Sequence, residues 1–583
     1  MSASDEHFDA VIVGSGFGGS VMAYRLAEAG LRACVLERGM AYPPNSFPRS
    51  PAGMKRNFWD PTGGLYGMFN VWSFSGLASV VSSGLGGGSL IYANVLIRKD
   101  EEWFVREDLQ NGGTEYWPVT RTDLDPHYDR VESMLNGQTY PYAESTSKTK
   151  AFKHAADTLG LDWHLPKLAV TFANEDEEPV PGEPIHEEHG NLHGRTRYTC
   201  RLCGECDIGC NYGSKNTLDY NYLSEAKRLG AELRTLCEVT TFAPSDGGGY
   251  TVRYVQHDPE NAPGTPVAEL PIRTLTTDRL VIAAGTLGST YLLLKNRRAF
   301  PDISDRLGER FCGNGDLLSW ALKCADVSNG KRLPRVIDGG HGPVITSTIR
   351  IPDTTDGGDG RGFYLQDAGY PEFANWMMQM IDSPKALWGW RRVAGQLVGS
   401  RLLRRKRIET DIGAEISGFF GDCELSAGLL PLLGMGRDVP DGTIRLSADG
   451  ELSVDWKMAT SRAYFERVST TMREVSTALG ARYVPNPTWH LNRVITVHPL
   501  GGCSMGRHEG EGVVNPYGEV FNYPGFYVAD GSVMPGPTGA NPSLTIAALA
   551  DRFADRLLVT RTRGEATVSS RGAINADATE PTA

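Results

Sequence analysis

One short stretch near the N-terminus constrains the fold more than any other part of this 583-residue chain. Three apolar residues, Val11 to Val13, lead into the turn Gly14-Ser15-Gly16-Phe17-Gly18-Gly19, and Ser20 to Ala29 then has helical spacing. A strand, a G-x-G-x-x-G turn and a helix in this order are typical of a dinucleotide-binding unit, because the glycines let the backbone and the helix N-terminus approach a pyrophosphate. We therefore predict an α/β fold with a Rossmann-like domain.

The next strand supports this interpretation. Arg32 to Leu36 is apolar and ends at Glu37, twenty-three residues after Gly14, where a carboxylate can accept hydrogen bonds from a ribose. We expect the following residues to contact the nucleotide: Gly14, Gly16, Phe17, Gly18, Gly19 and Glu37. The alternative, a chance glycine turn in a loop, does not account for the acid at the end of the second strand.

Composition excludes several classes of protein. A net charge of -12 argues against a nucleic-acid partner. No apolar run is long enough to span a bilayer, and Met1 to His7 is polar, without a signal-peptide core. Ten cysteines in a chain of this length, with no secretion signal, favour reduced thiols. We expect a cytoplasmic protein.

Two further glycine-rich segments are predicted to lie close to a ligand. Ser82 to Ser89 contains Gly86, Gly87 and Ser89 and is followed by Leu90 to Asn94; the alternative is a flexible loop. Leu233 to Phe242, Tyr250 to Gln256 and Asp278 to Ala284 are predicted strands. The last of them runs into Gly285 and an apolar helix start, which is a second strand–glycine–helix unit.

Four cysteines form a separate motif. Cys200, Cys203, Cys206 and Cys210 have the C-x2-C-x2-C-x3-C spacing of the bacterial ferredoxin ligand run. Asn211 stands where that motif has proline, and the chain has a single such run. The favoured hypothesis is that the four cysteines are ordinary small core residues, and we assign no metal site. The alternatives are an iron–sulfur cluster and a structural zinc.

The last third of the chain contains three further motifs. Thr496 to Gly506 places His498 before a proline and a glycine pair. Phe526 to Ser532 is a strand that ends in Asp530 and Gly531. Asn541-Pro542-Ser543 opens a helix from Ala547 to Leu557.

With G-S-G-F-G-G-S, G-L-G-G-G-S and A-A-G-T-L-G-S, these motifs make the chain resemble the glucose–methanol–choline (GMC) flavin oxidoreductases, in their cholesterol-oxidase-like branch. The resemblance covers Asp9 to about Leu558. It implies bound FAD and two domains. The FAD-binding domain comprises 1–110, 200–312 and 488–562, the sheet-based α+β substrate domain comprises 111–199 and 313–487, and 563–583 form a disordered tail.

The resemblance also implies site residues. His498 matches the family's active-site histidine and Asn541 its partner: the imidazole takes the hydroxyl proton of an alcohol, and the amide donates to the alcohol oxygen. Further FAD contacts are implied at these positions: Gly86, Gly87, Ser89, Asn94, Val239, Gly285, Asp530, Gly531 and Thr545.

The implied activity is oxidation of a bulky apolar alcohol, with the 3-hydroxyl of a sterol favoured and oxygen or another acceptor taking the electrons. The alternatives are a GMC dehydrogenase of another alcohol and a flavin or iron–sulfur electron-transfer protein. Gln366 falls where cholesterol oxidases carry a carboxylate for isomerisation of the sterol double bond, and an amide cannot act as a base. Asp367 on the same strand would face the other way, and Glu415 is another candidate.

One basic stretch stands out in this acidic chain. Trp388 to Arg407 contains Trp388, Trp390 and seven cationic residues from Arg391 onward. Cationic and aromatic side chains can contact an anionic membrane surface, so peripheral membrane contact is one hypothesis for this stretch; the favoured interpretation is a solvated basic helix.

Overall fold

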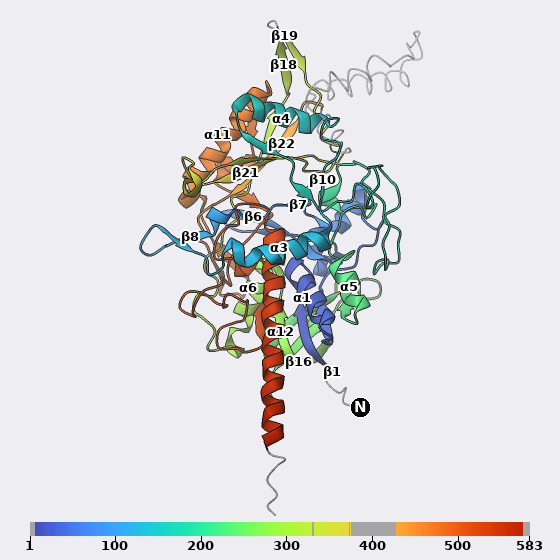
Figure 1. The fold of residues 1–583 in the computed structure, drawn as a ribbon, viewed down its shortest axis with the longest axis vertical. Helices are drawn as coiled ribbons and strands as arrows, with labels where there is room; N and C mark the ends of the chain where they lie inside the picture. Colours follow the sequence, from blue (N-terminus) through green and yellow to red (C-terminus); the bar gives the residue numbers. More distant parts are fainter. Residues whose placement is uncertain (1–5, 329–330, 372–373, 375–426, 575–583) are drawn as a thin grey trace, which may run out of the picture.

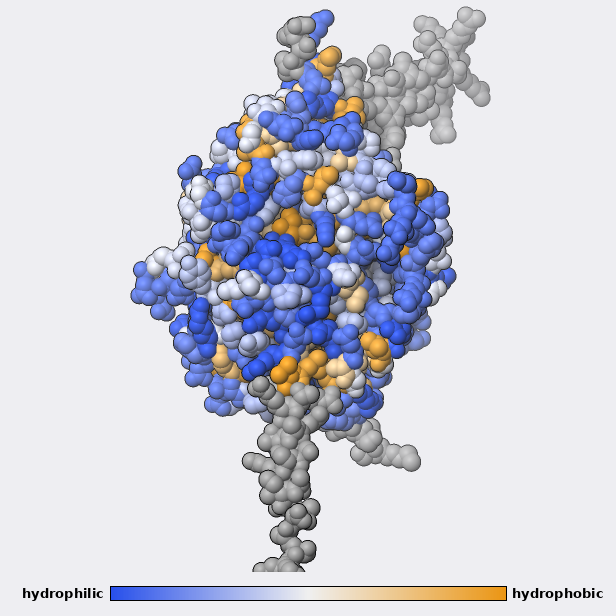
Figure 2. Space-filling model, in the orientation of Figure 1, coloured by the Kyte–Doolittle hydropathy of each residue, from blue (hydrophilic) through white to orange (hydrophobic). Residues whose placement is uncertain are grey.

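The computed structural model describes residues 6–328, 331–371, 374 and 427–574. The stretch Trp388 to Arg407 and the candidate Glu415 lie outside these ranges. No helix of the described ranges is long and apolar enough to cross a membrane. The face of the molecule seen in Figure 2 is mostly hydrophilic, with hydrophobic side chains in small, separate groups.

A seven-stranded sheet forms the centre of the nucleotide-binding half, in the order β13-β2-β1-β16-β15-β14, with β27 also paired to β16. Its strands are β1 (Glu6–Val13), β2 (Ala33–Leu36), β13 (Glu232–Arg234), β14 (Cys237–Pro244), β15 (Tyr250–Gln256), β16 (Ile272–Ile282) and β27 (Phe526–Val528). The strands β13, β2, β1, β16 and β27 are parallel, whereas β14 and β15 extend the sheet in antiparallel fashion. This is the predicted Rossmann-like arrangement.

Helices cover the central parallel strands, since every residue of β2 and β27 is buried, as is the C-terminal half of β1. They are α1 (Phe17–Glu28), α3 (Arg121–Leu135), α5 (Tyr222–Arg228), α6 (Gly285–Asn296) and α12 (Ser543–Ile574). In Figure 1 the long red helix α12 lies beside α1 and α3 and then projects from the body of the molecule. Leu544, Ala547 and Phe553 of α12 belong to the same hydrophobic core as β1.

The second half is built on a six-stranded antiparallel sheet, in the order β11-β20-β21-β22-β17-β25. Its strands are β11 (Asp162–His164), β17 (Leu317–Leu322), β20 (Thr348–Ile351), β21 (Phe363–Asp367), β22 (Leu430–Gly436) and β25 (Arg482–Pro485). The helices α4 (Ser147–Leu159) and α11 (Arg462–Ala478) pack together beside it (Figure 1).

Side chains alternate across this second sheet, as expected for strands. On β17, Leu317 and Ala321 pack into the core that includes Val468 and Met472 of α11. The intervening Leu318 and Trp320 line the large cavity described below. One face of the sheet therefore supports the fold, and the other faces the site.

Short strands and one short helix complete the described structure. They are α2 (Pro51–Met54), β3 (Trp59–Asp60), β4 (Leu65–Tyr66), β5 (Phe69–Ser73), β6 (Leu77–Ser82), β7 (Val95–Leu96), β8 (Val105–Glu107), β9 (Thr114–Tyr116), β10 (Gln138–Thr139), β12 (Lys167–Leu168), β18 (Ala325–Ser328), β19 (Lys331–Pro334), β23 (Thr443–Leu446), β24 (Leu452–Asp455) and β26 (Val494–Thr496). Strands β26, β6 and β5 form a small sheet, and β26 ends two residues before His498.

The structure corrects two predictions. The single strand expected over Leu233–Phe242 is two strands, because Leu236 has a positive φ of 58° and β13 and β14 pair with different neighbours. The disordered tail predicted for 563–583 is wrong for 563–574, which continue α12. Extending an existing helix adds one hydrogen bond per residue without a new nucleation cost. The domain boundaries themselves stay a prediction.

Candidate active site

A single cavity of about 910 Å³ connects the two halves of the protein. One end is lined by the glycine turn after β1, and the other by side chains of β17 and β22. The predicted residues on its wall are Gly14, Gly16, Phe17, Gly18, Glu37, Gly87, Asn94, Val239, Gly285, His498, Asp530, Gly531 and Asn541. The structure thus brings together residues that span almost the whole sequence.

The glycine turn is shaped by close backbone packing. A Cβ on Gly18 would lie 1.6 Å from the carbonyl oxygen of Ala529, and one on Gly14, which has a φ of +98°, would lie 2.4 Å from that of Ala283. A Cβ on Gly16 would meet no protein atom within 4 Å. Gly14 and Gly18 therefore allow strand and helix to approach, while Gly16 leaves room for a ligand.

Glu37 is held at the wall of the cavity by backbone and side-chain donors. Its carboxylate accepts hydrogen bonds from the Ser15 N–H at 3.0 Å, the Ser15 hydroxyl at 2.6 Å and the Gly39 N–H at 2.8 Å. These bonds fix the carboxylate beside the turn. A carboxylate oxygen has further lone pairs, so a ribose hydroxyl can still donate to it.

The second glycine run lies directly against the first on the wall of the cavity. A Cβ on Gly87 would lie 2.6 Å from the Cα of Gly16, so the two runs touch. Ser89 shapes this turn, because its hydroxyl donates to the Gly86 carbonyl at 2.7 Å and accepts from the Leu218 N–H at 3.1 Å. Gly86, Ser89 and Gly19 support the wall and are not themselves part of the lining.

Asp530 joins the closing strand to the second strand–glycine–helix unit. One carboxylate oxygen accepts from the Gly285 N–H at 2.9 Å and from the Ser289 hydroxyl, and the other accepts from the Ser532 N–H at 2.8 Å. Burial raises the pKa of Asp530, and these donors oppose that rise. The aspartate therefore organises the turn that faces the cavity.

His498 has a carboxylate partner that the sequence did not reveal. Its Nδ1 lies 2.8 Å from an oxygen of Asp316, which is buried at the start of β17. The second Asp316 oxygen accepts from the Thr496 hydroxyl at 3.0 Å and from the Val497 N–H at 2.8 Å. An ionised carboxylate can only accept, so Nδ1 carries the proton and Nε2 keeps a lone pair.

Asn541 is paired with Gln366 of β21. The Gln366 amide donates to the Asn541 oxygen at 2.8 Å, and the Asn541 amide donates back at 3.4 Å. This orientation leaves the second N–H of Asn541 free to donate into the cavity that the residue lines. Asp367, the next residue, faces away as predicted: Lys148 holds it at 2.9 Å, and both side chains are fully buried.

Thr545, like Gly86 and Ser89, was implied by the resemblance but does not line the cavity. It lies on α12, is fully buried, and its hydroxyl is 2.9 Å from that of Tyr128. Asp316 is the residue that sequence reasoning missed. Its only local signal is an acid in the glycine-rich segment Gly313 to Asp316, which by itself has many explanations.

Two observations show whether FAD fits the cavity: buried polar atoms that lack a hydrogen-bond partner, and glycines with free space where a Cβ would lie. Both amide atoms of Asn94 are buried without a hydrogen-bond partner, as are the hydroxyls of Tyr92, Thr286 and Ser543, and all four residues line the cavity. Buried polar groups are normally paired, so a polar ligand is expected beside them. Gly16, Gly88 and Gly285 leave open space for it. The residues present fit a long polar cofactor.

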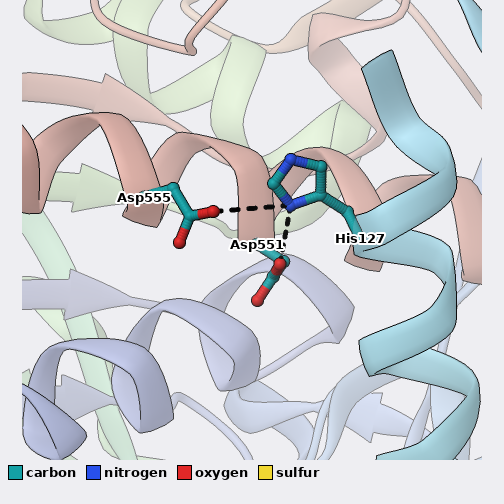
Figure 3. A group of neighbouring side chains, drawn as sticks. All are labelled: His127, Asp551 and Asp555. Carbon is teal, nitrogen blue, oxygen red and sulfur yellow. Dashed lines mark hydrogen bonds and ion pairs between the residues drawn. The ribbon is translucent and has the colours of Figure 1, made fainter. Parts of the chain in front are cut away.

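A second polar cluster has the wrong partners for a metal. His127 of α3 points toward Asp551 and Asp555 of α12 (Figure 3), and its Nδ1 is 2.7 Å from the first carboxylate and 3.9 Å from the second. Arg25 lies 2.6 Å from Asp555, and Arg130 also contacts both carboxylates. Two guanidinium groups already neutralise the acids, so the cluster joins helices.

Comparisons with known proteins agree with the geometry. Residues 438–550 match the family model described as GMC oxidoreductase, and residues 12–41 match an NAD(P)-binding Rossmann-like domain. The chain is 29% identical to a cholesterol oxidase of Mycobacterium tuberculosis, over 94% of this chain and 90% of the relative. It is 27% identical to a cholesterol oxidase of Acinetobacter baumannii, over 95% and 94%. It is 23% identical to a 2-methyl-1,2-propanediol dehydrogenase of Mycolicibacterium austroafricanum, over 95% and 96%.

The fold, the cavity and these matches support a flavoprotein of the GMC oxidoreductase type, which binds FAD and oxidises an alcohol. The similarity to the two cholesterol oxidases supports the cholesterol-oxidase-like branch of that family.

Proposed function

We propose that the protein oxidises a bulky apolar alcohol, with the 3-hydroxyl of a sterol as the favoured substrate, and that His498 is the base. The observation that carries this proposal is the His498–Asp316 pair at 2.8 Å on the wall of the large cavity. FAD, when bound, supplies the acceptor for the hydride that leaves the alcohol carbon.

His498 is suited to take the hydroxyl proton. Asp316 keeps the proton on Nδ1, so the lone pair of Nε2 is available to the substrate. As the imidazole gains positive charge, the adjacent carboxylate stabilises it. Three further donors hold Asp316 in place, namely Thr496 Oγ1 and the N–H groups of Val497 and His498.

Asn541 is suited to hold the alcohol oxygen. Its carbonyl oxygen is occupied by Gln366, so the side chain presents a donor to the cavity. A donor at this position favours the oxygen as negative charge develops during proton and hydride removal. Gln366 is therefore a positioning residue, because it sets the direction of the Asn541 amide.

The cavity wall favours an apolar substrate. The side facing the second sheet carries these hydrophobic residues: Leu318, Trp320, Val344, Ile345, Leu429, Pro431 and Leu433. An apolar wall of this kind favours a rigid hydrocarbon skeleton over a sugar. The two cholesterol oxidases among the relatives support the same choice. Oxygen or another acceptor then takes the electrons.

An anaerobic substrate screen tests this function. The purified flavoprotein is mixed with a sterol, a long-chain alcohol and a sugar, and bleaching of the flavin absorbance is recorded. We expect rapid bleaching by the sterol and none by the sugar. Bleaching by the sugar and none by the sterol would contradict the assignment, and bleaching by the long-chain alcohol alone would reduce it to the coarser class of apolar alcohols.

A further inference from the structure

The four cysteines of the ferredoxin-like run share one small pocket. Cys200, Cys203, Cys206 and Cys210 all line it, together with the buried Lys215. Cys200 is buried and the other three are half-buried, and none of the four forms a disulfide. Spacing in the sequence and position in the fold therefore agree, although the sequence alone favoured ordinary core thiols.

The backbone around the thiols is held in an uncommon conformation. Leu202 has a positive φ of 58°, which is rare for a bulky residue, and Gly204 has a φ of +65°. A Cβ on Gly204 would lie 2.9 Å from the carbonyl oxygens of Gly340 and Tyr370. Turns of this kind point successive side chains and N–H groups toward a common centre.

The buried Lys215 places a cation beside these cysteines. Its ammonium group donates to the carbonyl of Cys206 at 2.8 Å. A cation in this position offsets part of the negative charge that four thiolate ligands bring to one site.

The spacing of the thiols distinguishes two metal classes. A tetrahedral zinc requires its four sulfurs about 3.8 Å apart, given Zn–S bonds of about 2.3 Å. Within the described residues, the ligand atoms of His127, Asp551 and Asp555 form the one group of three within 4.8 Å of one another, and no three of the four sulfurs do. Sulfurs that lie further apart suit a cluster in which each thiolate binds a different iron.

We propose that Cys200, Cys203, Cys206 and Cys210 bind an iron–sulfur cluster of the four-iron type beside the FAD cavity. The cysteine pocket lies beside the FAD cavity because residues next to the cysteines also line that cavity. Asp207, directly after Cys206, lines the FAD cavity, as does Tyr92, whose carbonyl accepts from Lys215 at 2.9 Å. Val344, whose N–H is directed at Cys206, lines it too.

Such a cluster provides an exit for electrons, a role that rests on the proposed function. Alcohol oxidation delivers two electrons to the flavin. Its re-oxidation through the cluster takes two successive one-electron transfers, each passed to an external one-electron acceptor. The proton that the hydride leaves on the flavin and the hydroxyl proton taken by His498 are both released to solvent. Metal binding itself does not depend on which alcohol is oxidised.

Metal analysis of anaerobically purified protein, repeated after reconstitution with ferrous iron and sulfide, tests the proposal. We expect about four iron and four sulfide ions per chain, and a paramagnetic signal after reduction with dithionite. Cys203→Ala and Cys210→Ala should each lose the iron and retain FAD. The matched control is Cys324→Ala, a buried thiol on the second-sheet side, which should keep both.

Three results would overturn the cluster: wild-type iron no higher than in Cys203→Ala after reconstitution, zinc in place of iron, or iron retained in both Cys203→Ala and Cys210→Ala. The electron exit has its own readout. With ferricyanide as acceptor, Cys203→Ala should re-oxidise its flavin at least about tenfold more slowly than the control while its flavin reduction by alcohol is unchanged. Equal re-oxidation rates would refute the exit, and an inactive wild type with full iron would refute only the proposed alcohol oxidation.

Discussion

Replacing Asp316 by asparagine removes one negative charge next to His498 and leaves the shape of the side chain almost unchanged. The aspartate is buried, and its oxygen lies 2.8 Å from Nδ1 of the histidine. Two consequences follow. The positive charge that forms on the imidazole loses its partner, and the new amide can donate to Nδ1, which moves the proton to Nε2 and removes the lone pair that the substrate needs.

The expected loss can be estimated from the charge alone. Two unit charges about 4 Å apart interact with about 4 kcal/mol at an effective dielectric constant of 20. If the proton is half transferred in the transition state, about 2 kcal/mol is lost, and each 1.36 kcal/mol is tenfold in rate. Asp316→Asn should therefore slow flavin reduction by roughly 30-fold, and by up to about 1000-fold if transfer is complete.

Stopped-flow measurement of anaerobic flavin reduction provides the assay. The limiting rate should fall while the substrate dissociation constant stays within about threefold, since Asp316 acts through His498. Asp438→Asn is the matched control: this neighbouring buried acid accepts from the Gly313 N–H at 2.9 Å, whereas the carboxylate beside His498 Nδ1 is that of Asp316. If Asp316→Asn slows reduction no more than the control does, Asp316 does not support proton transfer.

Three other predictions follow from separate parts of the structure. Glu37→Ala should lower the flavin content per chain without preventing folding, because it removes the carboxylate fixed beside the glycine turn; full FAD occupancy would count against that contact. Burial raises the pKa of Asp438 to about 7 from its usual 3.8, so the folded state holds this proton more tightly than the unfolded state does. The free energy of unfolding therefore falls as pH rises between these two values, by up to about 4 kcal/mol. Asp438→Asn should accordingly gain stability over the wild type from pH 5 to pH 8 in urea unfolding, and a constant difference would refute this. Lys148→Met leaves Asp367 buried without its cation and should cost about 3–5 kcal/mol in the same assay, with no loss as the contrary result.

Local signals were sufficient for the nucleotide-binding elements. The glycine turn after β1 needs only the positive φ of Gly14 and the small size of Gly18, and both requirements are visible in the sequence. The strand Tyr250–Gln256 was predicted with its exact bounds, because an alternating segment flanked by turn residues has few other conformations. The helix after the second glycine segment was predicted to start at Tyr291 to Leu294, and it includes those residues but begins earlier, at Gly285.

Contacts between distant segments were not predictable in this way. Asp316 and His498 are separated by 182 residues, and nothing near either one indicates the other. The break at Leu236 arises because β13 joins β2 whereas β14 joins β15, which only the assembled sheet reveals. Thr545 followed from the family resemblance, yet its hydroxyl bonds Tyr128 and lies away from the cavity wall.

The central claim is that His498 removes the hydroxyl proton while the hydride leaves the alcohol. The most direct test is the rate of anaerobic flavin reduction in His498→Ala, measured with the sterol that best reduces the wild type and at equal FAD content. General base catalysis predicts a loss of about a hundredfold or more. A wild-type rate in His498→Ala would contradict the account and move the active site to another part of the cavity.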